Sequence, residues 1–488
     1  MHQNHSVAHT KKSVEELLSM HMYAMASELL EKGIHENPNS TELRIVQAKV
    51  ASESRDFYTA SDLYESLLKD NPDNPQLLVD GAMNCSRLGE LDNAIQHSKR
   101  AIELTDKSTR SVLSLADIYE RNNLTDEADT LISEISHTVQ GNSNYQRLKA
   151  RIFIAKEEYS DAIDYIQGLL DAGQDSTKST KLYFLLCKVY DRLGEYDEAW
   201  SAATKAHLLD DSPFDEQAFF SQFEQIRRCM TKEFLELLVE GPSTEAEPLF
   251  IVSNPRSGTS LLEQIIGMHS NVENGGEMPS GSLLQSAVTT LTDSYHPWPM
   301  NLIDLNVSDV NMMSNRYMEH CEFFRNGARI VSNKALNLHG QLGFLSKILP
   351  TSRAIFLLRN PLDNAVSCFT TNLLAAGLPY TNSLETIGKT WIARKKLTEL
   401  WLEILTIPMM ELHYENLVTD QRGETERIIE FLDLPWQEKC MEFHQSDRIA
   451  RTISYDQVNK KMYKTSSGRW KNYEKHLGPL IDVVSDYI

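Results

Sequence analysis

The 488-residue chain lacks the patterns that mark several large classes of protein. Its six cysteines are scattered and include no Cys-x-x-Cys pair, which argues against a disulfide framework or a zinc site. No stretch approaches the roughly 18 apolar residues that a membrane-spanning helix needs. Residues 1–14 contain no apolar run, so we expect no signal peptide and a cytoplasmic protein.

Net positive charge is also lacking. The formal charge is −21, which argues against a general nucleic-acid-binding protein because no positive field would attract a polyanion. Residues 1–250 hold 25 Lys and Arg against 43 Asp and Glu, whereas residues 251–488 hold 23 against 26. This asymmetry, together with the length, indicates two or more domains of different character.

A small residue recurs at a fixed interval in the acidic half. Five alanines are spaced 34 residues apart and a sixth follows after 37: Ala26, Ala60, Ala94, Ala128, Ala162 and Ala199. Positions four and seven residues after each alanine are mostly apolar or small, which predicts one inward-facing helical stripe per repeat. The pattern over residues 7–212 resembles the tetratricopeptide repeat and predicts an all-α solenoid of about six repeats.

Solenoids of this kind commonly hold a peptide or a partner protein on a concave surface. The acidic composition favours a basic partner. An array can also serve as an oligomerisation surface, so a homo-oligomer stays open. After the repeats, Ser212-Pro213 predicts the start of another helix, with Asp215 at the capping-box position. We assign residues 213–247 to a capping and connecting helix.

The second half begins with a strand, a polar loop and a helix. Residues 248–253 predict a short buried β-strand, and apolar residues from Leu261 onward mark the helix. Backbone N–H groups converge at such a junction, and the helix N-terminus favours an anion. The loop adds the guanidinium of Arg256 and the hydroxyls of Ser257, Thr259 and Ser260. It is not a Walker A loop, whose string occurs nowhere in the chain, and an ordinary strand–helix turn would have the same length.

A second arginine stands at the end of another predicted strand. Residues 354–358 are apolar and Arg359 follows, while Pro361 and Asp363 suit the first turn of a helix that carries Ser367. Ligands of open α/β sheets bind at the carboxyl ends of the strands. Two arginines at two strand ends therefore predict an anion with two separate charged groups.

These two motifs resemble the sulfotransferase superfamily, which uses 3′-phosphoadenosine 5′-phosphosulfate as co-substrate. Residues 255–260 are similar to its 5′-phosphosulfate loop and residues 359–367 to its 3′-phosphate motif. The combination with repeats resembles bacterial tetratricopeptide repeat-containing sulfotransferases, relatives of the protein-tyrosine sulfotransferases. The resemblance implies a P-loop-like α/β domain with a central parallel sheet over residues 248–488. It implies sulfuryl transfer to an acceptor hydroxyl, for example on a protein tyrosine or a glycan.

The resemblance also assigns residues to the donor. It places Arg256, Ser257, Gly258, Thr259 and Ser260 on the 5′-phosphosulfate, and Arg359 and Ser367 on the 3′-phosphate. It further implies that Tyr414 packs on adenine. Four residues near the C-terminus would reach a phosphate or close over the nucleotide: Lys460, Gly468, Arg469 and Trp470.

Catalytic roles follow from the same resemblance. Lys334 follows a third predicted strand, residues 329–331. It lies in an Asn-Lys context similar to that of the tyrosine enzymes, whose lysine stabilises the transferring group, and chemistry requires such a cation. Asn333 replaces the usual aspartate, and no proline follows, which leaves the loop shape open. Glu277 matches the Gly-Glu segment that carries the base, and Ser454 a serine near the sulfate. We therefore expect Arg256, Lys334, Glu277 and Ser454 to be catalytic, with no metal.

Several alternatives stay open at this point. His269 is the second choice for the base, although it fits a helix-capping role better, and His339 is the third. A P-loop kinase is a rival enzyme, disfavoured by the missing Walker lysine. A non-enzymatic rival is a repeat scaffold whose C-terminal domain only senses a nucleotide.

Overall fold

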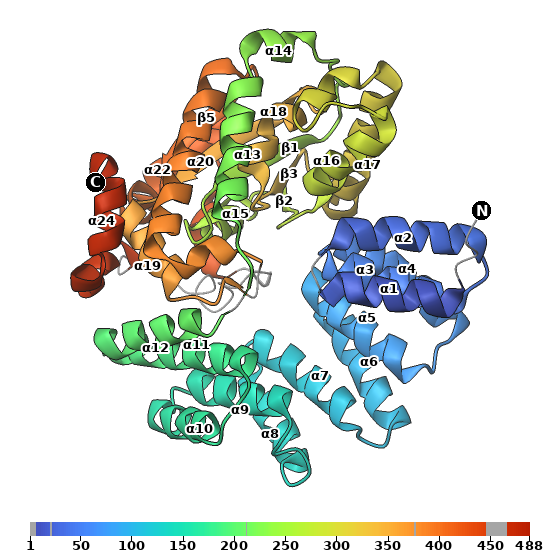
Figure 1. Cartoon of the computed structure of the whole chain (residues 1–488), viewed down its shortest axis with the longest axis vertical. Coiled ribbons are helices and arrows are strands. Elements are labelled where there is room, and N and C mark those ends of the chain that lie inside the picture. The colour runs from blue at the N-terminus through green and yellow to red at the C-terminus, as the bar shows by residue number, and fades with distance from the viewer. Residues whose placement is uncertain (1–5, 20–21, 211, 375–376, 446–465) are drawn as a thin grey trace. The chain divides into compact units, whose positions relative to one another are not determined.

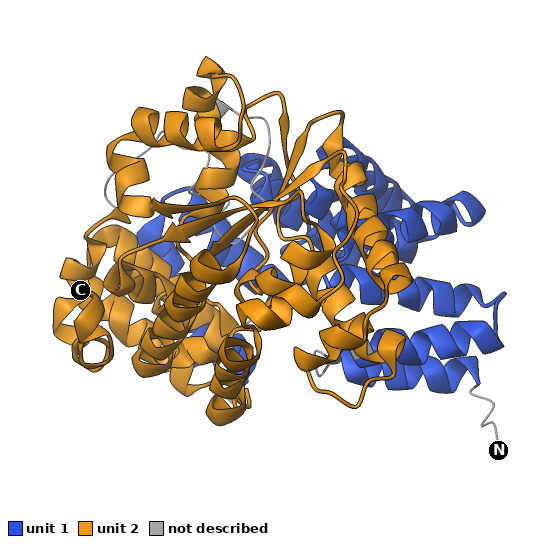
Figure 2. Ribbon diagram, turned by 90° about the horizontal axis from the view of Figure 1, so that it is seen from above, with its two compact units in different colours: residues 1–178 blue, residues 179–488 orange. Residues whose placement is uncertain are grey.

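The computed structural model describes residues 6–19, 22–210, 212–374, 377–445 and 466–488 (Figure 1). The chain divides into two compact units, residues 1–178 and 179–488 (Figure 2). The division falls inside one helix of the repeats, so the last helix pair belongs to the second unit. Within the described residues, no helix has both the length and the apolar content required to cross a bilayer.

Helix pairs fill the first unit and continue into the second. Their bounds are α1 Val7–Ser19, α2 Tyr23–Glu36, α3 Thr41–Glu53, α4 Phe57–Asp70, α5 Pro75–Leu88, α6 Leu91–Leu104, α7 Thr109–Arg121, α8 Thr125–Ile135, α9 Ser143–Ala155, α10 Tyr159–Asp171, α11 Ser176–Leu193 and α12 Tyr196–Leu208. We call α1–α12 the repeat array. This confirms the predicted all-α repeats.

Each predicted alanine occupies the same place in its repeat. It is the fourth residue of the second helix of a pair, and all six alanines are fully buried. The first helix of each pair also starts at a fixed interval. Polar N-cap side chains 34 residues apart accept backbone N–H groups at these starts. These caps are Ser40, Asn74, Ser108 and Asn142. The period in sequence therefore sets both the packing column and the helix starts.

The segment between the array and the sheet contains two helices rather than one. Helix α13 spans Glu216–Cys229 and α14 spans Lys232–Leu237. Asp215 is the N-cap of α13, with its carboxylate accepting the N–H of Ala218, so the helix starts three residues later than Pro213 indicates. Thr231 caps α14 in the same way.

The second unit is built on a parallel sheet with strand order β2-β3-β1-β4-β5. The strands are β1 Glu247–Ser253, β2 Val272–Asn274, β3 Ile330–Asn333, β4 Arg353–Leu358 and β5 Met409–His413. Three of them were predicted. The two missed strands, β2 and β5, lie at the sheet edges, and the three-residue β2 carries no apolar run.

Alternating residues of the strands enter two separate cores. Phe250, Val252 and Phe356 pack on one side against α13, α14, α16 (Ser280–Thr292), α17 (Val307–Arg325), α18 (Leu338–Ile348) and α20 (Leu384–Ile404). Leu249 and Ile251 pack on the other side against α15 (Thr259–Ile266), α21 (Tyr414–Thr419) and α22 (Gln421–Phe431). Burial of both faces explains the continuous apolar runs of β1 and β4.

The remaining helical elements lie beside these two layers. They are α19 Pro361–Phe369, α24 Gly478–Val484 and the 3₁₀ turns Met300–Asp304, Pro379–Asn382, Glu438–Gln445, Arg469–His476 and Ser485–Tyr487. Helix α19 follows β4 directly, and every one of its residues is buried. The sheet and its two helical layers confirm the predicted α/β domain.

Candidate functional site

The predicted phosphate loop, residues 254–258, connects β1 to α15. Arg256 and Gly258 have positive φ angles of 65° and 98°, and α15 begins at Thr259. The first N–H groups of a helix have no intrahelical acceptor, so this turn presents donors at the carboxyl end of β1. This geometry fits the predicted phosphate loop.

Both the φ angle and the adjacent Tyr414 side chain require a glycine at position 258. A Cβ atom built there would lie 2.4 Å from Cδ2 of Tyr414, far inside van der Waals contact. Tyr414, at the start of α21, is buried and lies flat beneath Arg359, whose Cζ is 4.7 Å from the ring centroid. The predicted contact of Tyr414 with adenine stays a prediction.

Arg359 is a buried cation at the end of β4. Only 9% of it is exposed, and it forms no salt bridge with a described residue. Its Nη1 and Nη2 donate to the carbonyls of Arg256 and Ser466, both at 2.6 Å, and its buried Nε has no hydrogen-bond partner among the described residues. A buried guanidinium bonded only to neutral oxygens is costly unless an anion joins it.

Helix α19 ties the phosphate loop to Arg359. Asn360 caps the helix by accepting the N–H groups of Leu362 and Asp363. Asn364 donates to the carbonyl of Pro255 at 2.8 Å and lies 3.2 Å from Oγ of Ser257. Ser367 accepts from Nε of Arg256 at 3.2 Å. The two predicted motifs therefore form one site.

Asp363 brings the C-terminal segment, residues 466–476, to the same place. Its carboxylate accepts the backbone N–H of Gly468 at 2.7 Å and of Trp470 at 2.8 Å. Gly468 has a φ of 77° and begins the 3₁₀ turn that follows. Two residues predicted to close over the nucleotide are thus fixed beside Arg359 through their backbone.

Lys334 and Glu277 meet at the neighbouring strand end. Nζ of Lys334 lies 3.6 Å from Oε1 of Glu277 and 3.8 Å from Oε2 of Glu263. Lys334 is 4% exposed, whereas a quarter of the Glu277 side chain is exposed. Glu263 is held by Oγ of Ser332 at 2.7 Å and by the N–H of Gly276 at 3.0 Å.

Backbone hydrogen bonds place Glu277 opposite Lys334. The N–H of Gly275 donates to the carbonyl of Ser332, and the N–H of Lys334 donates to the carbonyl of Gly276. A Cβ atom at Gly275 would lie 2.4 Å from the Ser332 carbonyl oxygen, so the close approach of the two chains requires glycine. Asn333 shapes the following turn by accepting the N–H of Ala335.

The two alternative bases have other surroundings. His269 is buried, with Nε2 2.8 Å from the carbonyl of Pro435 and Nδ1 accepting the N–H of Asn271. Both of its ring nitrogens are therefore engaged by the backbone, which is a structural role. His339 is buried, and burial and the charge of Arg394 hold its pKa well below the ordinary value. Its site favours the neutral imidazole.

Three further predicted residues lie toward the C-terminus: Ser454, Lys460 and Arg469. Ser454 and Lys460 lie outside the described residues. The guanidinium of Arg469 contacts Asp191 of α11, and its role toward a nucleotide stays a prediction. No group of three or more His, Cys, Asp or Glu side chains that could hold a metal occurs in the described part of the chain.

Three site residues were missed from the sequence: Glu263, Asn364 and Arg394. Glu263 lies on the apolar face of its helix, and an acidic residue at such a position indicates a specific polar partner. The sequence pattern could therefore have identified it. Arg394 of α20 is 5% exposed, and its Nε and Nη1 have no hydrogen-bond partner in the described part of the chain. The charges of Arg394, Arg256 and Arg359 all act on Cys368 of α19.

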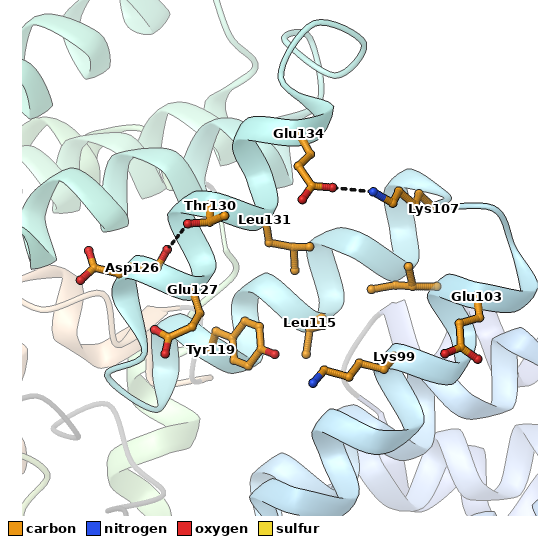
Figure 3. Close-up of a pocket in the computed structure, with 11 residues that line it drawn as sticks. Lys99, Glu103, Lys107, Leu115, Tyr119, Asp126, Glu127, Thr130, Leu131 and Glu134 are labelled. Atoms are coloured by element: carbon orange, nitrogen blue, oxygen red, sulfur yellow. Dashed lines mark hydrogen bonds and ion pairs between the residues drawn. The ribbon is translucent and has the colours of Figure 1, made fainter.

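The repeat array carries a separate surface feature. A hollow of about 640 Å³ lies among α6, α7 and α8 (Figure 3). Its centre is apolar, with Leu115, Tyr119 and Leu131, and a salt bridge of 2.6 Å between Lys107 and Glu134 borders it. Four acidic side chains line it against two lysines: Glu103, Asp126, Glu127 and Glu134, against Lys99 and Lys107.

Comparison with known families assigns both parts of the chain. Residues 248–438 match the model of the sulfotransferase family. Residues 87–152 match the model of the tetratricopeptide repeat. The two matches agree with the repeats and the sulfotransferase-like domain that the sequence motifs predicted.

Two curated relatives are similar over part of their length. An uncharacterised protein of Aquifex aeolicus (strain VF5) is 26% identical over 311 residues, which cover 62% of this chain and 41% of that protein. Protein-tyrosine sulfotransferase A of Caenorhabditis elegans is 22% identical over 215 residues, which cover 43% of this chain and 56% of that protein. The alignments thus span between two fifths and three fifths of these relatives.

Solved structures are similar to each half. The sulfotransferase domain of the Synechococcus PCC 7002 olefin synthase has 18% identity and a TM-score of 0.35, covering 48% of this chain and 90% of that domain. A tetratricopeptide repeat protein of Parabacteroides merdae has 16% identity and a TM-score of 0.38, covering 41% of this chain and 78% of that chain.

Proposed function

We propose that the protein transfers a sulfuryl group from 3′-phosphoadenosine 5′-phosphosulfate to an acceptor hydroxyl. The observation that carries this proposal is Arg359, a buried guanidinium beside an anion-binding loop with no salt bridge to a described residue. An unpaired buried cation favours an anionic ligand at that position. Ser367, in contact with Arg256 of the loop, lies at the same place.

The donor fits this arrangement as a molecule with two separated anionic groups. The phosphate loop and the start of α15 would hold the 5′-phosphosulfate, with Arg256, Ser257, Thr259 and Ser260 as donors. Arg359 and Ser367 would hold the 3′-phosphate. Gly468 and Trp470, fixed by Asp363, would close over the nucleotide.

Lys334 and Glu277 supply the groups that the transfer needs. The acceptor oxygen attacks sulfur, the bond between sulfur and the 5′-phosphate oxygen breaks, and the products are a sulfate ester and adenosine 3′,5′-bisphosphate. Glu277 takes the acceptor proton, and Lys334 stabilises the negative charge on the departing oxygen. The two side chains lie 3.6 Å apart, so both groups can reach the same acceptor oxygen.

The acceptor is proposed to be a hydroxyl of a protein tyrosine or a glycan. The acidic lining of the hollow on α6–α8 supports a basic peptide or protein as the partner of the repeat array. These assignments extend the family resemblance and are tested separately from the donor.

Calorimetry tests the donor. We expect adenosine 3′,5′-bisphosphate to bind at least tenfold more tightly than ATP. We expect Arg359→Gln to weaken this ligand more than it weakens adenosine 5′-monophosphate, since only the former has a 3′-phosphate. Arg353→Gln is the matched control, because Arg353 lies at the opposite end of β4 and pairs with Glu247. Equal binding of ATP would instead favour the kinase.

Sulfate transfer tests the reaction and distinguishes the enzyme from a nucleotide sensor. Cell-lysate fractions are incubated with the protein and donor labelled in the sulfuryl group, and the labelled product is identified by mass spectrometry. A sulfated product that requires Glu277 supports the proposal. Tight nucleotide binding with no labelled product in any fraction would favour the sensor.

A further inference from the structure

The last helix pair of the array is part of the support of the sulfotransferase site. The Trp200 ring of α12 stacks on two rings, with centroids 4.5 Å from Phe369 and 5.0 Å from His476. Nε2 of His207 is 2.9 Å from the carbonyl of Phe369. Phe369 ends α19, the helix that carries Ser367, so α12 packs directly on the proposed 3′-phosphate element.

Asp191 of α11 holds the C-terminal segment from the repeat side. One oxygen of its carboxylate binds Nη2 of Arg469 and accepts the hydroxyl of Tyr473 at 2.5 Å. Only about a quarter of the Asp191 and Arg469 side chains is exposed. A second set of contacts adds Asp197 of α12, which binds Lys475 and lies 3.0 Å from Nε2 of His476.

The same segment is held on its other side by the nucleotide-site residues. Asp363 accepts the N–H groups of Gly468 and Trp470, and Arg359 donates to the carbonyl of Ser466. Residues 466–476 therefore run between two anchors. One anchor is the predicted phosphate-binding element, and the other is the acidic end of the repeat array.

We propose that Asp191 is a positioning residue for the nucleotide: it acts through Arg469 to hold the C-terminal segment against Asp363 and Arg359. Arg469 then contributes by fixing the backbone at Gly468 and Trp470, with its guanidinium engaged by α11. The inference deepens the proposed function and rests on it. By this inference the last repeat, α11 and α12, is required for nucleotide binding, although none of its residues is assigned to the ligand.

A double-mutant cycle on the full chain tests this role. Calorimetry measures the Kd of adenosine 3′,5′-bisphosphate for the wild type, Asp191→Asn, Arg469→Gln and the double variant. We expect each single change to weaken binding about tenfold, and the double variant to lose about the same factor, because both changes break one interaction. Glu198→Gln, which removes an exposed carboxylate of α12, should bind as the wild type does.

The outcomes separate the possible failures. If the wild type does not bind adenosine 3′,5′-bisphosphate, the proposed function fails. If the wild type binds and Asp191→Asn binds equally well, or if the two losses multiply, the positioning role fails and Arg469 acts independently of Asp191.

A milder change keeps the test valid if Asp191→Asn does not fold. Tyr473→Phe removes only the hydroxyl group that donates a hydrogen bond to the Asp191 carboxylate. It should raise the Kd about threefold and raise the donor KM while leaving kcat unchanged. An unchanged Kd and KM in this variant would contradict the proposal.

Discussion

Nζ of Lys334 lies 3.6 Å from Oε1 of Glu277, and the two residues belong to the segments that follow β3 and β2. The contact joins a buried cation to a carboxylate that is still a quarter exposed, so the acid can meet a substrate while the lysine stays fixed. Glu263 supports the lysine from behind at 3.8 Å. The proposed base, Glu277, and the proposed cation, Lys334, are therefore in direct contact.

Glu277→Gln should separate binding from turnover. The amide keeps the size of the side chain but cannot take a proton, so we expect kcat to fall at least a hundredfold. The Kd of adenosine 3′,5′-bisphosphate should stay within a factor of two, measured by calorimetry. Glu273→Gln, four residues earlier on β2, is the control for loss of one charge. Full activity in Glu277→Gln would remove this residue as the base.

Gly258→Ala should damage both folding and nucleotide binding. The new methyl group would overlap the Tyr414 ring at a φ of 98°, which L-residues rarely adopt. We expect the free energy of unfolding to fall by about 1–3 kcal/mol. Gly478→Ala is the control, since a Cβ atom there meets nothing within 4 Å. Denaturant unfolding and calorimetry measure the two effects, and wild-type values for both would show that the loop is less constrained.

Asp117→Asn should change the acid stability of the repeat array. Burial by itself would raise the pKa of Asp117, but Arg121 and Arg151 outweigh it and hold the pKa well below its ordinary value. A lowered pKa in the folded state stabilises the protein at pH values above about 4, and this contribution is lost as the pH falls toward the lowered pKa.

Denaturant unfolding of this variant should show a pH-dependent difference. We expect Asp117→Asn to unfold about 2 kcal/mol more easily at pH 7, with a smaller difference from the wild type at pH 3. Asp164→Asn, at an exposed position of α10, should match the wild type throughout. A pH-independent difference would show that packing, and not charge, is the contribution of Asp117.

Ala162→Leu should show that the alanine column is a packing requirement. The alanine is fully buried between helices, and a larger side chain forces them apart. Overpacking of this kind costs about 1–3 kcal/mol. Ala155→Leu, at an exposed position near the end of α9, is the control and should unfold as the wild type does. Equal stability of both variants in thermal unfolding would show that the buried alanines are not required for helix packing.

The predicted parts of the fold are those that depend on neighbours along the chain. The alanines stand one helical turn into each second helix because the 34-residue period is a local property of every repeat. Strands β1 and β4 were recognisable because they are buried on both faces and carry uninterrupted apolar residues. The edge strands β2 and β5 lack that signal, and the strand order depends on contacts between distant segments.

Asp363 marks the point where prediction from the sequence ends for the site. Its position in the first turn of α19 suggested only a favourable interaction with the helix dipole. Its carboxylate in fact binds the backbone of Gly468, 105 residues away. Glu263 shows the same limit, because its partners Ser332 and Lys334 come from a different strand.

The sequence by itself determined the repeats, the two predicted phosphate motifs and their assignment to the ends of two strands, since each depends on residues within one or two turns. Tertiary structure alone decided that β1 and β4 are neighbours, which brings Arg256 to Ser367. It also decided that Asp191 of the last repeat meets Arg469. Such pairings depend on how helices and strands pack, and no local pattern of residue types encodes a partner 278 positions away.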